Sequence, residues 1–552
     1  MQFRAKLNIN KPVYAGITIS SIFAGIIGFI TGAQKQEKSE TEKFIKLRDK
    51  YTKKLEPRKK RFNEAKWKLN TDPNQSVQFL YIMANRDLIK LHRNKSMYRK
   101  FADIDIQQLS QHDANQLKMI LNSFDDKLKV EELKSVINSK VYSANNKYNE
   151  YVLVVDGRQY TQIELFNLLQ TEKNPDIRKK ACETLLKRGN RITKDLIEIV
   201  KARNNYAHAK GYDNYYEYVL KETYNTDPEY IDKLMEDVYS KIQPKAVAIH
   251  ERRDKRLKEF FGVEKLERYH YGLLSDSDPT RLTDEILKNE SIENISKKTY
   301  AGMGYDIDKF ITDGKLTMDL YPRKNKNPGT FCSEVEPGKD VRILANITDC
   351  SRSLESLNHE LGHCIYSLGI SQDLPFLDRK PSSAALTEAI ALMMGDIKKK
   401  ENILKGIVPD YILKGYKDSL KRDAVENLVR ELLIMTFERE IYKNPNQNPA
   451  ELWAKLREKY LDISAPADNE WADMPHYLNY PGYYQNYFRA TLMKAQIYNH
   501  LHEVLGNITE NKKTAEYMNK NIFSAGASVN EYDLIRQLTG KELGTEDFVK
   551  GL

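Results

Sequence analysis

Residues 354–368 of this chain read LESLNHELGHCIYSL, and this stretch decides how the surrounding fold has to be built. Five apolar side chains recur in it at helical spacing: Leu354, Leu357, Leu361, Ile365 and Leu368. On a helix with about 100° between successive residues, all five lie on the side opposite His359 and His363. We therefore predict a helix that packs by one side and presents two imidazoles, one turn apart, from the other.

The run His359-Glu360-Leu361-Gly362-His363 has the spacing of a zinc site, because imidazoles at positions i and i+4 suit two ligands of one tetrahedral ion. Glu360 lies about 100° further round the helix, near the metal without being forced to bind it. A third ligand is required, and Glu388 is the best candidate. It is the only charged residue of 384–395, and a carboxylate in so apolar a helix is costly unless it is paired or bound to metal. The alternative is that Glu388 meets an arginine or the helix surface.

A third segment, Pro475–Arg489, reads PHYLNYPGYYQNYFR. His476 stands in a loop punctuated by proline and glycine, which leads into a helix. Three tyrosines lie on one face of that helix: Tyr483, Tyr484 and Tyr487. Phenol hydroxyls and an imidazole N–H can stabilise an oxyanion, although a chain with 34 tyrosines can also use such a cluster for packing.

The rest of the chain is dominated by polar and apolar residues alternating at helical spacing, so we expect a mainly helical, all-α fold. The clearest strand signal is DVRILANIT, residues 340–348. A chain of 552 residues can bury a large core, whereas its four cysteines are too few for a disulfide scaffold.

The net charge of +10 is not spread evenly. The first 100 residues carry 23 basic and 8 acidic side chains, and the remainder carries 65 and 70. A slightly acidic body behind a basic N-terminal segment argues against a nucleic-acid enzyme.

Residues 13–33 contain no charged side chain and follow Arg4, Lys6 and Lys11. A run of 21 residues can span a bilayer, and the positive-inside rule places its basic flank in the cytoplasm. We expect an uncleaved anchor that tethers the body outside the cytoplasm. The alternatives are a cleaved signal peptide, which would leave the body secreted or periplasmic, and a buried core helix. The predicted domains are thus a signal or anchor segment (1–33), a charged tether or solvated helix (34–60) and a catalytic domain (61–552).

Several of these segments carry a family resemblance. GKDVRI (338–343), HELGH with the later glutamate, IMANRD (82–87) and residues 476–487 resemble the angiotensin-converting-enzyme family of peptidyl-dipeptidases and its bacterial relatives. They are also similar to the thimet oligopeptidase and oligoendopeptidase family, and KARNNYAHAKGYDNYYEYV (201–219) fits both. The resemblance implies a gluzincin: a helical, two-lobed ellipsoid with a small sheet near one zinc ion, at the floor of a deep channel that only short or unfolded peptides can enter.

The resemblance also implies a role for each matching residue. His359, His363 and Glu388 match the zinc ligands, and Glu360 matches the general base that acts on zinc-bound water. His476 matches a histidine that contacts the substrate backbone, Tyr487 the oxyanion-stabilising tyrosine and Tyr484 the tyrosine one turn before it. Tyr483 is a further candidate for substrate contact. Ser333 and Glu334 occupy the strand edge where related enzymes pair with the substrate, and Cys332 and Cys350 match a disulfide-bonded pair.

Three departures from the converting-enzyme pattern bear on specificity. The gap of 25 residues between His363 and Glu388 is nearer the oligopeptidase pattern. Met474 replaces the lysine that anchors the substrate C-terminus, and Asn486 replaces a chloride-binding arginine. Strict release of C-terminal dipeptides and chloride activation are therefore not implied.

We predict a monomeric zinc-dependent peptidase that acts on short peptides, either as a dipeptidyl carboxypeptidase or as an oligopeptidase. The alternative is a catalytically inactive, membrane-tethered protein that binds peptides on the same fold. Cys182 and Cys364 are expected to be buried small apolar residues rather than ligands.

Overall fold

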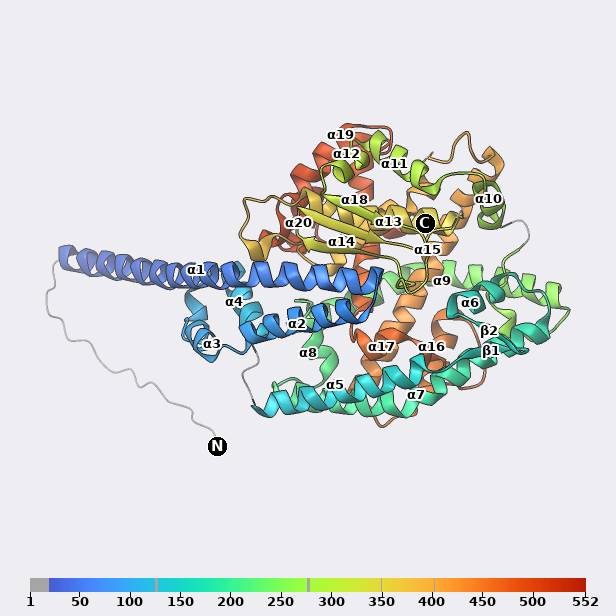
Figure 1. The fold of residues 1–552 in the computed structure, drawn as a ribbon, viewed down its shortest axis with the longest axis horizontal. Helices are drawn as coiled ribbons and strands as arrows, with labels where there is room; N and C mark the ends of the chain where they lie inside the picture. Colours follow the sequence, from blue (N-terminus) through green and yellow to red (C-terminus); the bar gives the residue numbers. More distant parts are fainter. Residues whose placement is uncertain (1–18, 125–127, 276–277, 349, 402) are drawn as a thin grey trace. The chain divides into compact units, whose positions relative to one another are not determined.

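The computed structural model describes residues 19–124, 128–275, 278–348, 350–401 and 403–552 (Figure 1). Within them the chain is 70% helical, which confirms the predicted fold class. The chain divides into two compact units: unit 1 takes in the described residues of Met1–Arg58 and Asp87–Asp126, and unit 2 those of Lys59–Arg86 and Lys127–Leu552. These units differ from the predicted domains, because 87–126 separate from the rest of the predicted catalytic domain.

Unit 1 contains most of α1 (Ile19–Thr71), the end of α2 (Gln75–His92), α3 (Lys95–Ala102) and α4 (Gln111–Ser123). The Tyr51 ring packs 5.8 Å from both Phe101 and Phe124, and Phe44 is fully buried. Of the predicted tether or solvated helix, residues 34–58 fall in this unit as part of α1. Its buried apolar side chains Phe44, Tyr51 and Leu55 contribute to the core of the unit.

Part of the predicted membrane segment, residues 13–18, lies outside the described residues. The part from Ile19 onward belongs to α1. Among the helices that the structure describes, none combines the length and apolar character needed to cross a membrane.

Unit 2 begins with the end of α1 and the greater part of α2, up to Arg86, and contains the remaining helices and both sheets. Its helices are α5 (Leu128–Asn149), α6 (Gln162–Thr171), α7 (Pro175–Ala209), α8 (Tyr215–Glu222), α9 (Pro228–Phe261), α10 (Pro279–Leu287), α11 (Ile292–Met303), α12 (Ile307–Thr312), α13 (Ser351–Gly369), α14 (Ala384–Lys400), α15 (Asp410–Lys443), α16 (Pro449–Leu461), α17 (Pro475–Asn479), α18 (Tyr484–Leu505), α19 (Lys513–Met518), α20 (Glu531–Thr539) and α21 (Glu546–Lys550).

The larger sheet has the strand order β3–β5–β4, with β3 (Leu316–Asp319) parallel and β4 (Phe331–Glu336) antiparallel to β5 (Asp340–Leu344). The predicted strand 340–348 is therefore present but ends at Leu344. Gly338, with φ of 72°, makes the tight turn between β4 and β5. A separate hairpin pairs β1 (Leu153–Val155) with β2 (Arg158–Tyr160).

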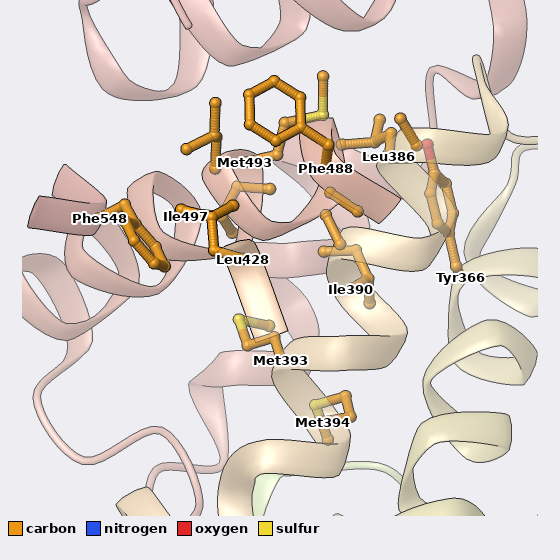
Figure 2. Packing of buried hydrophobic residues seen from close by; sticks show 14 of the residues in the cluster. Tyr366, Leu386, Ile390, Met393, Met394, Leu428, Phe488, Met493, Ile497 and Phe548 are labelled. Carbon is orange, nitrogen blue, oxygen red and sulfur yellow. The ribbon is translucent and has the colours of Figure 1, made fainter. Parts of the chain in front are cut away.

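The centre of the core is a layer in which α13 packs along α14 and α14 packs along α18. Figure 2 shows the apolar side chains that fill it, which are almost entirely buried: Tyr366, Leu386, Ile390, Met393, Met394, Leu428, Phe488, Met493 and Ile497. As predicted, the leucines of α13 face this core. The layer holds the two histidine-bearing turns of α13 at a set distance from α14.

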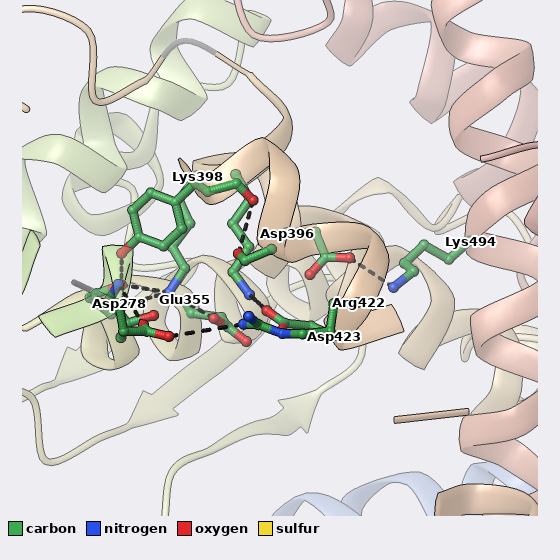
Figure 3. Close-up of polar contacts among 12 residues, drawn as sticks. Asp278, Glu355, Asp396, Lys398, Arg422, Asp423 and Lys494 are labelled. Carbon is green, nitrogen blue, oxygen red and sulfur yellow. Dashed lines mark hydrogen bonds and ion pairs between the residues drawn. The ribbon is translucent and has the colours of Figure 1, made fainter. Parts of the chain in front are cut away.

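Ion pairs fix the ends of the same helices (Figure 3). The buried Lys398 on α14 donates to the Ser351 carbonyl at 2.7 Å, at the start of α13, and pairs with Glu355 at 2.7 Å. Asp396 pairs with Lys494 on α18 at 2.7 Å, so it links α14 to α18. Each pair stops one helix from sliding along its neighbour.

Gly362 sets how closely α13 approaches α14. A Cβ atom at this position would lie 2.9 Å from the Ala391 Cα and 3.1 Å from the Met394 Cγ, which is closer than real Cβ atoms come to backbone. Any side chain here therefore pushes the two helices apart.

We expect Gly362→Ala to destabilise the protein by about 1–3 kcal/mol, the usual cost of overpacking a core. Gly395→Ala on α14 is the matched control, since its Cβ would meet the Glu355 carbonyl at an ordinary 3.4 Å and alanine favours the helix. Thermal unfolding of the two variants measures the difference. Equal stability would mean that the helices are not in tight contact at Gly362.

Candidate metal centre and active site

Three side chains from α13 and α14 converge at one point. The ligand atoms of His359, His363 and Glu388 all lie within 4.8 Å of one another. Glu388 Oε2 is 3.5 Å from His359 Nε2 and 3.8 Å from His363 Nε2. Two ligands of a tetrahedral zinc, each about 2.1 Å from the ion, lie about 3.4 Å apart, so the cluster has nearly the dimensions of such a site.

Burial makes these groups poor at carrying charges of their own. It lowers the pKa of His359 to about 4 and that of His363 to about 3, so both imidazoles are neutral and able to bind a metal at pH 7. It raises the pKa of Glu388 to about 7, because a buried carboxylate lacks solvation. A cation between the three groups would provide the missing compensation.

The two oxygens of Glu388 have different surroundings. Oε1 accepts a hydrogen bond from the Tyr483 hydroxyl at 3.1 Å. Oε2, which faces the imidazoles, is buried and has no hydrogen-bond partner among the described residues. An orphaned buried carboxylate oxygen aimed at two neutral imidazoles fits a zinc ion, and the donor set of two nitrogens and one carboxylate suits it.

Thr387, which precedes Glu388, supports the second histidine. Its hydroxyl lies 2.8 Å from His363 Nδ1. The tautomer that leaves Nε2 free for a metal carries its proton on Nδ1, which then donates to Thr387. Sequence reasoning missed this residue. Its only signal is a polar side chain beside the glutamate in an otherwise apolar run.

Glu360 lies beside the metal cluster without belonging to it. Its pKa is raised to about 8, first by burial and then by the charge of Glu388. The Glu360 carboxylate lies beside the Cys332 backbone N–H on β4, which acts on its pKa in the opposite direction. The predicted general base is thus held between the metal cluster and the open edge of a strand.

His476 and the tyrosines form one cluster, with the His476 ring centroid 6.2 Å from that of Tyr483, 4.9 Å from Tyr484 and 6.1 Å from Tyr487. Burial raises the pKa of Tyr487, and the charges of Glu388 and Glu360 act in the same direction. After burial, the main influences on Tyr484 are instead Glu431 and Arg430 on α15. The three hydroxyls therefore differ: Tyr483 donates to a predicted ligand, the charges of Glu388 and Glu360 act on Tyr487 together with that of Glu431 on α15, and Tyr484 is influenced chiefly by α15.

Two buried residues that sequence reasoning did not single out hold the segment carrying this cluster. Arg203 on α7 donates to the backbone carbonyls of Tyr477 and Leu478, at 2.7 and 2.6 Å. Glu438 on α15 accepts from the Gly482 N–H at 2.9 Å. An acid directly after the apolar run LLIMTF (432–437) was the available signal for Glu438.

Ser333 and Glu334 lie on β4, the edge strand beside Glu360. Glu334 is partly buried, and burial of its carboxyl raises its pKa. Met474 packs against the core at the start of α17, and Asn486 is fully buried and accepts from Arg489 at 3.0 Å.

The predicted Cys332–Cys350 disulfide is not formed, and all four cysteines are free. Cys332 points from β4 toward Cys364 on α13, with the two sulfur atoms 3.3 Å apart. Cys350, at the start of α13, contacts Thr348 and Ser353 instead. Alternate side chains of β4 face α13, and this direction decides the pairing.

A family model, "Peptidase family M3", matches residues 168–552, which include every predicted ligand and the whole tyrosine cluster. The chain belongs to peptidase family M3. Of the two families that the sequence resembles, the match is to that of thimet oligopeptidase and oligoendopeptidase F. M3 membership supports a hydrolase of the metallopeptidase class, and members are typically zinc-dependent.

The chain is also similar to an "Oligoendopeptidase F homolog" of Borreliella burgdorferi, with 24% identity over 293 residues. The aligned stretch covers 50% of this chain and 47% of that protein, so the chain spans about half the length of this M3 relative.

The hydrogen bond of Thr387 to His363 predicts a role in holding the metal. Thr387→Val should weaken zinc binding by about 10- to 100-fold, the usual effect of losing a partner of a metal-bound histidine. Thr387→Ser keeps the hydroxyl and should restore most of the affinity. Competition with a chelator measures both, and equal affinity of the valine and serine variants would contradict the role.

Proposed function

We propose that this protein is a zinc-dependent oligopeptidase that hydrolyses peptide bonds within short peptides. The observation that carries the proposal is the cluster of His359, His363 and Glu388, with an orphaned carboxylate oxygen at its centre and Glu360 directly beside it. Membership of peptidase family M3 supports the same chemistry.

Zinc bound by these three residues would polarise the scissile carbonyl and make water a better nucleophile. Glu360 is the group placed to accept the proton of the attacking water and return it to the leaving amine. Burial raises the pKa of this carboxyl toward neutral pH, which suits a group that must both accept and return a proton.

Tyr487 is the best candidate for the donor that stabilises the developing oxyanion, because the charges of both Glu388 and Glu360 act on its hydroxyl. Burial lowers the pKa of His476, so its imidazole is neutral at pH 7 and offers one N–H to a substrate carbonyl. Tyr483 is less suited, since its hydroxyl already donates to Glu388.

Within this class we favour cleavage of internal bonds over release of C-terminal dipeptides. The family match and the name of the Borreliella relative support an oligoendopeptidase. Met474 packs against the core at the position where a dipeptide-releasing enzyme would need a lysine for the terminal carboxylate. The proposed substrates are short peptides, and the proposed active form is a monomer.

We expect the zinc-loaded protein to cut a ten-residue peptide internally whether its C-terminus is free or amidated, as read by mass spectrometry of the products. A chelator should stop cleavage. Glu360→Gln should keep the metal and lower the rate by about 10²- to 10⁴-fold. Glu355→Gln, the other acid on α13, should change it little. Dipeptides from the free form alone would indicate a dipeptidyl carboxypeptidase, and no cleavage of any peptide would favour a protein that only binds peptides.

The roles assigned to the tyrosines predict that one phenylalanine variant lowers kcat and the other weakens zinc binding. Tyr487→Phe should lower kcat by about 10²- to 10³-fold with unchanged zinc affinity, the cost of one oxyanion donor. Tyr483→Phe should weaken zinc binding, because it removes a hydrogen bond to Glu388. Titration with zinc and kinetics at saturating zinc separate the two effects, and an unaltered kcat for Tyr487→Phe would move the role to another hydroxyl.

We also propose that the catalytic body works outside the cytoplasm. This proposal rests on the uncharged run 13–33 and its basic flank alone.

A further inference from the structure

The open edge of β4 runs past the proposed catalytic carboxylate. In the strand order β3–β5–β4, β4 pairs with β5 on one side only. Residues 332 and 334 direct their backbone groups to the other side, because alternate residues of a strand share an edge. This part of β4 lies against the Glu360 turn of α13: the Cys332 and Cys364 sulfur atoms are 3.3 Å apart, and the Cys332 N–H lies beside the Glu360 carboxylate. An extended peptide that added to this edge as a further strand would therefore pass Glu360.

Helix α1 takes up the far end of the same edge. The part of α1 from Lys59 onward belongs to unit 2, as β4 does. Asn63 Nδ2 donates to the Glu334 carbonyl at 2.9 Å and lies 3.4 Å from the Val335 carbonyl. Lys60 pairs with Glu336 at 2.7 Å. The regular pairing of β4 with β5 is interrupted between Glu334 and Glu336, at the point where α1 binds.

Other contacts hold this part of α1 against the sheet region. The Arg342 guanidinium of β5 lies 5.8 Å from the centre of the Trp67 ring. The Asn327 backbone N–H and side-chain amide donate to the backbone and side-chain oxygens of Asn70, at 2.8 and 2.7 Å. The contact of Asn63 is thus one of several along the helix and is built into the fold.

Glu360 lies beside the Cys332 N–H, and Asn63 occupies the Glu334 carbonyl. Between these two groups, the Cys332 carbonyl and the Glu334 N–H face the open edge. An antiparallel peptide could donate one of its N–H groups to the Cys332 carbonyl and accept a hydrogen bond from the Glu334 N–H with one of its carbonyls. The peptide residue between that N–H and that carbonyl would lie opposite Ser333. The peptide N–H that bonds the Cys332 carbonyl lies nearest Glu360. Because Glu360 returns a proton to the leaving amine, this nitrogen would be the leaving one, and the scissile bond directly precedes it. The carbonyl then belongs to P2, the second residue before the scissile bond.

We infer that Asn63 limits how far a substrate pairs with β4 on the N-terminal side of the scissile bond, and this rests on the function proposed above. The N–H of P2 would bond the Glu334 carbonyl in a longer strand, but Asn63 occupies that carbonyl. Pairing therefore stops at P2. A third or fourth residue gains no backbone hydrogen bond from the strand.

The test is a series of peptides with one common C-terminal part and one to five residues, alanines at the outer positions, before the same scissile bond. For the zinc-loaded protein, kcat/KM should rise by about 2- to 10-fold from one to two residues, the worth of one backbone hydrogen bond. It should change less than about 2-fold with each further residue. Mass spectrometry of the products confirms that every peptide is cut at the same bond.

Asn63→Ala exposes the Glu334 carbonyl. Adding a third residue turns the terminal amine of P2 into an amide N–H, which can then bond the exposed Glu334 carbonyl. In this variant the third residue should therefore raise kcat/KM by a further 2- to 10-fold or so. An ester in place of that amide removes the N–H and should abolish the gain. Asn70→Ala is the matched control, because it removes an anchor of the same helix two turns away and leaves β4 untouched. It should keep the wild-type profile.

A wild-type kcat/KM that climbs with the third, fourth and fifth residue would overturn the inference, although peptide cleavage itself would stand. So would a limit that appears on the C-terminal side, since the peptide would then run parallel to β4. An Asn63→Ala profile equal to that of Asn70→Ala would also overturn it. Absence of cleavage of every peptide by the wild type would instead count against the proposed function.

Discussion

The close contact of α13 with α14 is the constraint on which the rest of the site depends. The contact is possible because Gly362 has no side chain, and it lies between the two turns that carry His359 and His363. At this separation Glu388 reaches both imidazoles from the neighbouring helix. A wider gap would leave a buried carboxylate and two buried imidazoles without any common point.

The polar groups around the cluster follow from the same burial. Each buried group needs a partner, and the fold supplies one from a different element: Thr387 for His363, Tyr483 for Glu388, and the β4 backbone for Glu360. One oxygen of Glu388 is left over, and it points at the histidines. The unpartnered oxygen of Glu388 thus lies at the point where a cation would bind.

Sequence reasoning located most of the candidate site because its residues lie on helices with a clear apolar side. The spacing of His359 and His363, and the isolation of Glu388 in an apolar run, were sufficient to bring these three together. The roles within the tyrosine cluster could not be assigned in the same way. Tyr483, Tyr484 and Tyr487 share a face, and only the packing of α18 against α14 and α15 shows which carboxylate each hydroxyl meets.

The sequence by itself determined the helical fold class and the candidate residues for the metal site and the general base, because periodicity and residue chemistry are local properties. Tertiary structure decided what depends on contacts between distant segments: that Cys332 faces Cys364, that Asn63 meets the edge of β4, and that residues 34–58 belong to a packed unit with 87–124. Such contacts join residues that are tens to hundreds of positions apart. A local sequence pattern cannot predict such contacts, since it does not show which of several distant segments will pack against it.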